Sequence, residues 1–247
     1  QLKLRGSYGV NGNAGIGNYD APALYGFGFN YNQLPGSAPT NVGDENLTWE
    51  LNKPMNIGLD FSVLKNRVNV TVDYYIRKSE NLLLSVPLSN TSGFGSATRN
   101  IGSMENKGLE LSLNIVPIQT KDLRWDLDFN FSNNKNTITS LPNKADILSG
   151  NFVIRQGQSL NTFFLREWAG VDRSTGDPLW YTNDKHQASS SVYPGASARI
   201  LAGQALPKFF GSLTNAITYK GFNLSAQLYY NFGNQVFDTW RGFYLGS

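Results

Sequence analysis

The chain has 247 residues, of which 40% are hydrophobic, so it is long enough for one large folded domain. Its net charge is only +3 and its Lys and Arg residues are scattered, which excludes the basic surface that nucleic-acid-binding proteins use. It contains no cysteine, which excludes disulfides and thiolate metal sites. No run of about 18 apolar residues occurs, which excludes a membrane-spanning helix.

Seven segments alternate apolar and polar residues, as β-strands with two different faces do. They cover about residues 2–10, 47–63, 67–83, 101–116, 123–138, 208–219 and 222–233. The apolar faces are expected to carry Val70, Leu111, Phe129 and Leu228, and the polar faces Asn69, Glu110, Asp128 and Gln227. On the polar faces we expect charge networks between Asp60, Asp73, Glu110, Asp126 and Asp128 and the cations Arg67, Arg77, Lys107 and Arg124.

The connections between these strands alternate between long and short. The short ones are residues 64–67, 117–122 and 220–221, and all of them fall at the same end of the strands. The long ones, rich in Gly, Asn, Ser and Pro, lie at the other end, and the largest covers about residues 139–207. Outer-membrane β-barrels have this asymmetry, with short periplasmic turns and long extracellular loops. The pattern therefore predicts an all-β, antiparallel transmembrane β-barrel fragment whose apolar face meets outer-membrane lipid.

Seven strands leave two unpaired edges, and unsatisfied backbone groups are costly in lipid. We therefore expect the remainder of a barrel to lie outside this sequence. Two other interpretations stay open from the pattern alone. One is a secreted β-sandwich that acts as a carbohydrate-binding or adhesin module, although such domains place long connections at either end. The other is a segment of a passive porin, which alternation of side chains does not exclude.

Several segments resemble one family closely and in order. They are GNAGIGNY at residues 12–19 and the segments at residues 45–84, 91–114, 166–183 and 206–238. These segments are similar to the C-terminal barrel region of SusC/RagA-type TonB-dependent outer-membrane transporters. The resemblance implies a barrel of about 22 strands, of which this chain supplies about a third. Residues 1–247 are expected to be one partial barrel domain, with the plug domain, the TonB box and the final strand not recognisable in it.

The same resemblance implies partners and a location. The complete protein would sit in the outer membrane of a Bacteroidota-type Gram-negative bacterium. It would hold a plug inside the barrel, contact TonB through its N-terminal region and pair with a SusD-like surface lipoprotein that covers the barrel as a lid. Its cargo would be an oligosaccharide or a peptide.

No catalytic residue, enzyme activity or cofactor is predicted. The single histidine, His186, lies in a polar loop, and no G-x-S-x-G elbow or phosphate-binding loop occurs. Asp172 and Asp177 are spaced as in a calcium loop, but position 12 of such a loop would be Asn183, which lacks the required carboxylate. An Asx turn explains these residues better, so no metal is predicted.

Exposed aromatic side chains on the long connections are the candidates for contact with a ligand or with the lid, because sugars stack on flat rings. The alternative is that these rings only stabilise their own loops. The candidates are Tyr25, Phe94, Trp168, Trp180, Tyr181 and Trp240.

Overall fold

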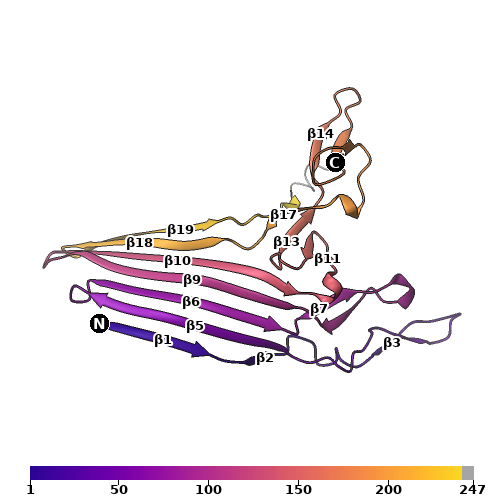
Figure 1. Cartoon of the computed structure of the whole chain (residues 1–247), viewed down its shortest axis with the longest axis horizontal. Helices are drawn as coiled ribbons and strands as arrows, with labels where there is room; N and C mark the ends of the chain where they lie inside the picture. The colour runs from indigo at the N-terminus through magenta and orange to yellow at the C-terminus, as the bar shows by residue number, and fades with distance from the viewer. Residues whose placement is uncertain (241–247) are drawn as a thin grey trace.

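The computed structural model describes residues 1–240 and contains one large antiparallel sheet of eight strands. Its strands follow one another in chain order as an up-and-down meander (Figure 1). The fold class predicted from the sequence is confirmed. The strands are β1 (Leu2–Tyr8), β2 (Asn11–Asn13), β5 (Glu50–Val63), β6 (Val68–Glu80), β9 (Ser103–Gln119), β10 (Leu123–Ser140), β18 (Phe209–Tyr219) and β19 (Phe222–Phe232).

The observed strand ends differ from the expected ones by at most three residues, and one expected strand is interrupted. The expected first strand is split into β1 and β2, which both pair with β5. Between them Gly9 N donates to Pro54 O at 3.1 Å, so the two pieces continue one another along β5. Residues 241–247 of the expected domain lie outside the described residues.

Three tight turns join the strands at one end of the sheet, on the left in Figure 1. In the turn between β18 and β19, both Lys220 and Gly221 have positive φ, 45° and 89°, as a two-residue hairpin of type I′ requires. Lys220 N also donates to Asp122 O in the neighbouring turn at 2.9 Å. The three long connections leave the opposite end, which confirms the predicted asymmetry.

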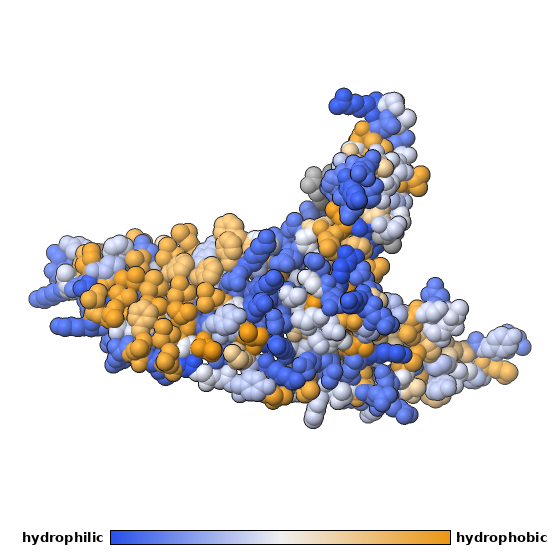
Figure 2. Space-filling view, viewed as in Figure 1, coloured by the Kyte–Doolittle hydropathy of each residue, from blue (hydrophilic) through white to orange (hydrophobic). Residues whose placement is uncertain are grey.

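The register joins the apolar sides of the strands into one continuous face. Phe61 pairs with Val70, Val70 with Leu113, and Leu113 with Phe129. Phe129 pairs in turn with Leu213, and Leu213 with Leu228. Figure 2 shows hydrophobic side chains gathered over the strands towards the short turns, with hydrophilic ones towards the loops. None of the four predicted apolar-face residues is buried, and Leu228 is 68% exposed.

The sheet is a single layer, which contradicts the β-sandwich interpretation. A sandwich would bury these strands against a second sheet, but large hydrophobic residues such as Ile57, Tyr74 and Leu109 stay exposed. The described part of the chain instead has its hydrophobic cluster at the base of the loops, around Ile138 and Leu141. Among the described residues, no helix is long and apolar enough to cross a bilayer.

The polar face carries a charge network centred on a residue that the sequence did not single out. Arg5 binds Asp60 through two hydrogen bonds of 2.8 and 2.9 Å and also contacts Asp73 at 2.8 Å. Gly58 makes this possible, because a Cβ there would lie 2.6 Å from the Arg5 guanidinium. Asp128 accepts a hydrogen bond from Asn114 at 2.7 Å instead of from a cation.

The cations predicted for this network are only partly placed as expected. Arg124 does pair with Asp126, at 2.6 Å. Arg67 instead donates to the backbone oxygens of Val116 and Pro117 in the neighbouring strand. Lys107 pairs with Ile76 in register, so it belongs to the apolar face, where it contacts Glu105 at 3.3 Å. Arg77 lies over the Tyr75 ring at 4.6 Å. The prediction was therefore wrong for Arg67, Arg77 and Lys107. Parity assigns a face but not a partner, and Lys107 alternates in step with Leu109 and Leu111, which places it on the apolar face.

The long connections contain their own small sheets. The connection expected at residues 139–207 contains two of them, because short hydrophobic pieces pair within it. The loop strands are β3 (Tyr25–Phe27), β4 (Ser37–Pro39), β7 (Leu83–Pro87), β8 (Ser96–Asn100), β11 (Ile147–Ser149), β12 (Phe152–Ile154), β13 (Thr162–Leu165), β14 (Trp168–Val171), β15 (Pro178–Tyr181), β16 (Ser189–Ser190) and β17 (Ile200–Gln204). The 3-10 helices are η1 (Asn90–Ser92), η2 (Pro142–Lys144) and η3 (Ala196–Ala198).

Candidate functional site

The longest connection, between β10 and β18, folds into two small sheets that stand above the loop end of the main sheet (Figure 1). The lower sheet has the order β11-β12-β13-β17 and is held by buried Val153 and Phe163. Phe163 also stacks on Phe152 with a centroid distance of 4.8 Å. The upper sheet, β14-β15-β16, carries three of the six aromatic candidates.

Three of the predicted aromatic residues come together in the upper sheet. Trp168 and Trp180 meet edge to face at 5.3 Å, and Trp180 meets Tyr193 in the same way at 5.0 Å. Tyr181 stacks on His186 at 4.2 Å. Trp168 remains 51% exposed, so part of its ring is open to a ligand or a partner. The cluster thus both stiffens the hairpin and presents a ring outward, which fits each of the two predicted roles.

The remaining aromatic candidates lie elsewhere in the fold. Tyr25 is 66% exposed in β3. Phe94 follows η1 at the tip of the β7–β8 hairpin, where it lines a second pocket of about 780 Å³ together with residues such as Pro22 and Val42. Trp240 follows β19 and is 68% exposed. The six candidates therefore do not form one site.

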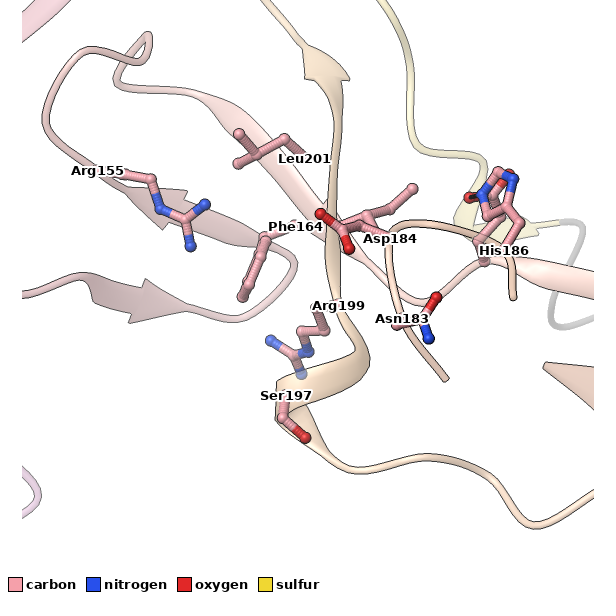
Figure 3. Close-up of a pocket in the computed structure, with 10 residues that line it drawn as sticks. Arg155, Phe164, Asn183, Asp184, His186, Ser197, Arg199 and Leu201 are labelled. Atoms are coloured by element: carbon pink, nitrogen blue, oxygen red, sulfur yellow. Dashed lines mark hydrogen bonds and ion pairs between the residues drawn. The ribbon is translucent and has the colours of Figure 1, made fainter. Parts of the chain in front are cut away.

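A pocket of about 750 Å³ lies between the two small sheets (Figure 3). Arg155, Phe164 and Arg199 come from the lower sheet and its flanks, and Asp184 and His186 come from the loop between β15 and β16. This volume is within the range of small-molecule sites.

Most charged groups around this pocket are already paired. Arg155 binds Asp146 with hydrogen bonds of 3.0 and 2.6 Å, which raise the pKa of Arg155 further above its usual value. Its guanidinium also lies over the Phe164 ring at 5.1 Å. His186 Nε2 and Glu167 Oε2 are 2.7 Å apart. The Nε of Arg199, in contrast, is buried without a hydrogen-bond partner among the described residues.

The segment from Asp172 to Asp177 forms a tight turn between β14 and β15. Asp172 Oδ1 accepts hydrogen bonds from Ser174 Oγ at 2.6 Å, Ser174 N at 2.8 Å and Thr175 N at 3.4 Å. Asp177 N donates to Thr175 Oγ1 at 3.3 Å. This is the Asx turn that the sequence favoured. Within the part of the chain that is described, no group of three or more His, Cys, Asp or Glu side chains could hold a metal ion.

The Asp172 turn gives a pH-dependent prediction. The hydrogen bonds from Ser174 and Thr175 lower the pKa of Asp172 in the folded state. The carboxylate therefore stabilises the turn above its unfolded pKa of about 3.9, and this contribution is lost as pH falls through the lower folded pKa. We expect the protection of the Ser174 and Thr175 amides in the wild type, relative to Asp172→Asn at the same pH, to decrease as pH falls below about 4, measured by hydrogen–deuterium exchange mass spectrometry.

Comparing the two proteins at the same pH removes the intrinsic effect of pH on exchange. Asp177→Asn is the matched control, because no hydrogen bond to the Asp177 carboxylate is present in the described structure, and it should behave as the wild type does. A ratio of wild-type to Asp172→Asn exchange that stays the same between about pH 6 and about pH 3 would contradict the prediction.

Sequence reasoning missed the residues that build the pocket. Arg155, Asp184 and Arg199 lie far apart in a polar loop and belong to no motif. These residues are brought together by the pairing of β13 with β17 and by the β15–β16 loop, which folds back to line the same pocket. Both features belong to the tertiary structure. The same holds for Arg5, which lies 55 residues from Asp60.

The comparison with known proteins places the chain in a family. A family model described as TonB dependent receptor-like, beta-barrel, matches residues 1–246. The chain belongs to this family. TonB-dependent receptor P39 of Formosa agariphila is 32% identical over 280 residues, with 96% of this chain and 27% of that protein covered. TonB-dependent receptor SusC of Bacteroides thetaiotaomicron is 32% identical, with 96% of this chain and 25% of SusC covered.

Solved structures agree with this assignment to the TonB-dependent receptor family. The chain matches a structure described as the RagAB peptide transporter with a TM-score of 0.81 and 32% identity. The match covers 94% of this chain and 26% of that one. The chain thus spans about a quarter of the length of the relatives that it matches. The predicted resemblance to SusC/RagA-type transporters is confirmed.

Proposed function

We propose that this chain forms part of the wall of a SusC-like outer-membrane transporter that imports oligosaccharides or peptides with energy from TonB. The complete transporter would work with a SusD-like surface lipoprotein as its lid. The named relatives are receptors and transporters, and we propose that this chain likewise performs no covalent chemistry.

The observation that carries this proposal is the two-faced single sheet. One face is apolar from β1 to β19 and stays exposed, as a surface in contact with lipid must be. The other face carries hydrogen-bonded polar pairs such as Ser62 with Asn69 at 2.7 Å and Asn114 with Asp128 at 2.7 Å. Such pairs suit the wall of a water-filled lumen, where each polar group finds a partner or water.

The loops support the proposed contact with cargo or lid. They stand at the end of the sheet away from the tight turns, which corresponds to the extracellular side of an outer-membrane barrel. They present the exposed ring of Trp168 and two pockets of about 750 and 780 Å³. The RagAB structures are described as a peptide transporter or importer, which favours a cargo of similar size for this chain.

An uptake experiment separates the proposed transporter from a passive porin. Cells that express the complete protein would receive a fluorescent oligosaccharide or a fluorescent peptide too large for porins, with and without TonB. We expect periplasmic accumulation of one of them only when both the transporter and TonB are present. Accumulation that persists without TonB would favour the porin alternative.

A further inference from the structure

The pocket between the two small sheets is lined by Arg199, whose guanidinium has an edge suited to a carboxylate but no carboxylate partner among residues 1–240. Arg199 Nη1 donates to Gly150 O at 3.1 Å, which anchors one end of its guanidinium. Its Nε is buried without a partner, and its Nη2 makes no hydrogen bond to any described residue. Nε and Nη2 form the side edge of the guanidinium, which matches the two oxygens of a carboxylate.

Three other arginines in the chain show how the Nε and Nη2 edge of a guanidinium binds a carboxylate. In Arg5, Arg124 and Arg155 the Nε and Nη2 atoms together hold one carboxylate, that of Asp60, Asp126 and Asp146 respectively. The distances range from 2.6 to 3.0 Å. Arg199 also lines the pocket, but the Nε atom of this edge is buried, and the described residues supply no acid for it.

We infer that this pocket binds the carboxylate end of an oligomeric ligand through the Nε and Nη2 edge of Arg199. The inference rests on the proposed transport function and deepens it by naming a chemical group of the cargo. Because the Nε atom is buried, binding requires the Arg199 side chain to turn towards the pocket. That turn relieves a buried unsatisfied donor, which is itself destabilising.

The opposite wall is suited to the part of the ligand next to the carboxylate. Asp184 lies in the loop between β15 and β16 and points towards the middle of the pocket (Figure 3). Its carboxylate makes no hydrogen bond or ion pair within the described residues, so it is free to accept a hydrogen bond from a ligand N–H or O–H. Leu201, 39% exposed, supplies an apolar surface for a side chain.

A carboxylate of this kind could belong to the C-terminus of a peptide or to a uronic acid of a glycan, and the pocket favours the peptide. Sugars bind by stacking on a free ring face, but Phe164 is only 9% exposed and one of its faces is covered by Arg155. A peptide places a hydrophobic side chain and backbone N–H groups next to its carboxylate, which matches Leu201 and Asp184.

The test uses the complete transporter, purified in detergent, with isothermal titration calorimetry. The probes are trileucine, trileucine with an amidated C-terminus, and trigalacturonate. We expect trileucine to bind roughly ten- to a hundredfold more tightly than its amide, as a hydrogen bond to a charged group predicts. The variant Arg199→Gln should abolish this difference. Arg173→Gln, an exposed arginine at the tip of the β14–β15 hairpin, is the matched control and should keep it.

The other outcomes are equally informative. Binding of trigalacturonate that depends on Arg199, without binding of trileucine, overturns the peptide assignment in favour of an acidic glycan. No binding of any probe, or equal binding to Arg199→Gln and wild type, overturns the inference. Uptake that requires TonB, measured with the same variants, reports on the proposed transport function separately. Heat-modifiable migration of Arg199→Gln on gels shows that its barrel is folded.

Discussion

Replacing Leu228 with Arg is expected to destabilise the assembled barrel by about 2–4 kcal/mol, whereas Arg at the adjacent Gln227 is expected to cost about 0–1 kcal/mol. Both residues lie at the middle of β19, between Phe222 and Phe232. Leu228 pairs with Leu213 on the apolar face, and Gln227 pairs with Thr214 on the polar face. An arginine at Leu228 therefore enters lipid near the midplane, where its charge loses water, while one at Gln227 stays hydrated in the lumen.

Reversible unfolding of the complete protein in urea, in lipid vesicles, measures this difference. The pair is well matched, because the two side chains are neighbours and the described structure shows no hydrogen bond to either. Leu228 and Gln227 also lie far from the loop pockets, so differences in cargo binding do not enter. An equal loss of stability at the two positions would contradict the orientation assigned to the sheet.

Gly108→Ala is expected to destabilise the sheet by about 1–3 kcal/mol, as overpacking in a close-packed site does. A Cβ at Gly108 would lie 2.2 Å from the backbone oxygen of Asn133 in β10, which cannot move without distorting the strand pair. It would also lie 2.6 Å from the hydroxyl oxygen of Tyr75. The Tyr75 side chain is buried and passes over Gly108, and its hydroxyl donates to Asn134 Oδ1 at 3.1 Å. The alanine therefore collides with both the backbone and this hydrogen bond.

Gly6→Ala is the control for this prediction, because a Cβ at Gly6 has no heavy atom within 4 Å. It removes the same backbone freedom from the unfolded chain without a collision, so it should be neutral or slightly stabilising. In a Tyr75→Ala background, Gly108→Ala should cost less than it does in the wild type but still destabilise, since the contact with Asn133 remains. Urea unfolding in vesicles is again the measurement, and equal stabilities of Gly108→Ala and Gly6→Ala would disprove the close approach.

The expected strands agree closely with the observed ones because the pattern that reveals them is local. Successive side chains of a strand point to opposite faces, so the alternation around Val70 and Leu228 assigned each residue to a face before any partner was known. The Lys220–Gly221 turn could be predicted from the sequence for the same reason, because the tolerance of Gly221 for a positive φ depends on that residue alone. The lengths of the connections then placed all tight turns at one end.

The sequence was much less informative about the loops. The long connection between β10 and β18 looks featureless, yet it contains two sheets held by Val153, Phe163 and the Trp168–Trp180 contact. Short strands of three or four residues carry too little alternation to be recognised. Their pairing depends on which distant segment folds back against them.

The strands, the two faces of the sheet and the end at which the loops lie could all be predicted from the order of the residues, and the resemblance to SusC/RagA-type transporters indicated the family. Which charges meet follows from tertiary contacts alone. Arg5 reaches Asp60 and Asp73 because β1 pairs with β5 and β5 with β6 in one register, with Gly58 leaving room between them. The Nε of Arg199 has no partner within residues 1–240, because the path of the loop brings the backbone oxygen of Gly150 to the guanidinium and no acid from the described residues. The alternation of side chains is local, whereas the partner of a charge depends on register and on the path of the chain between distant segments.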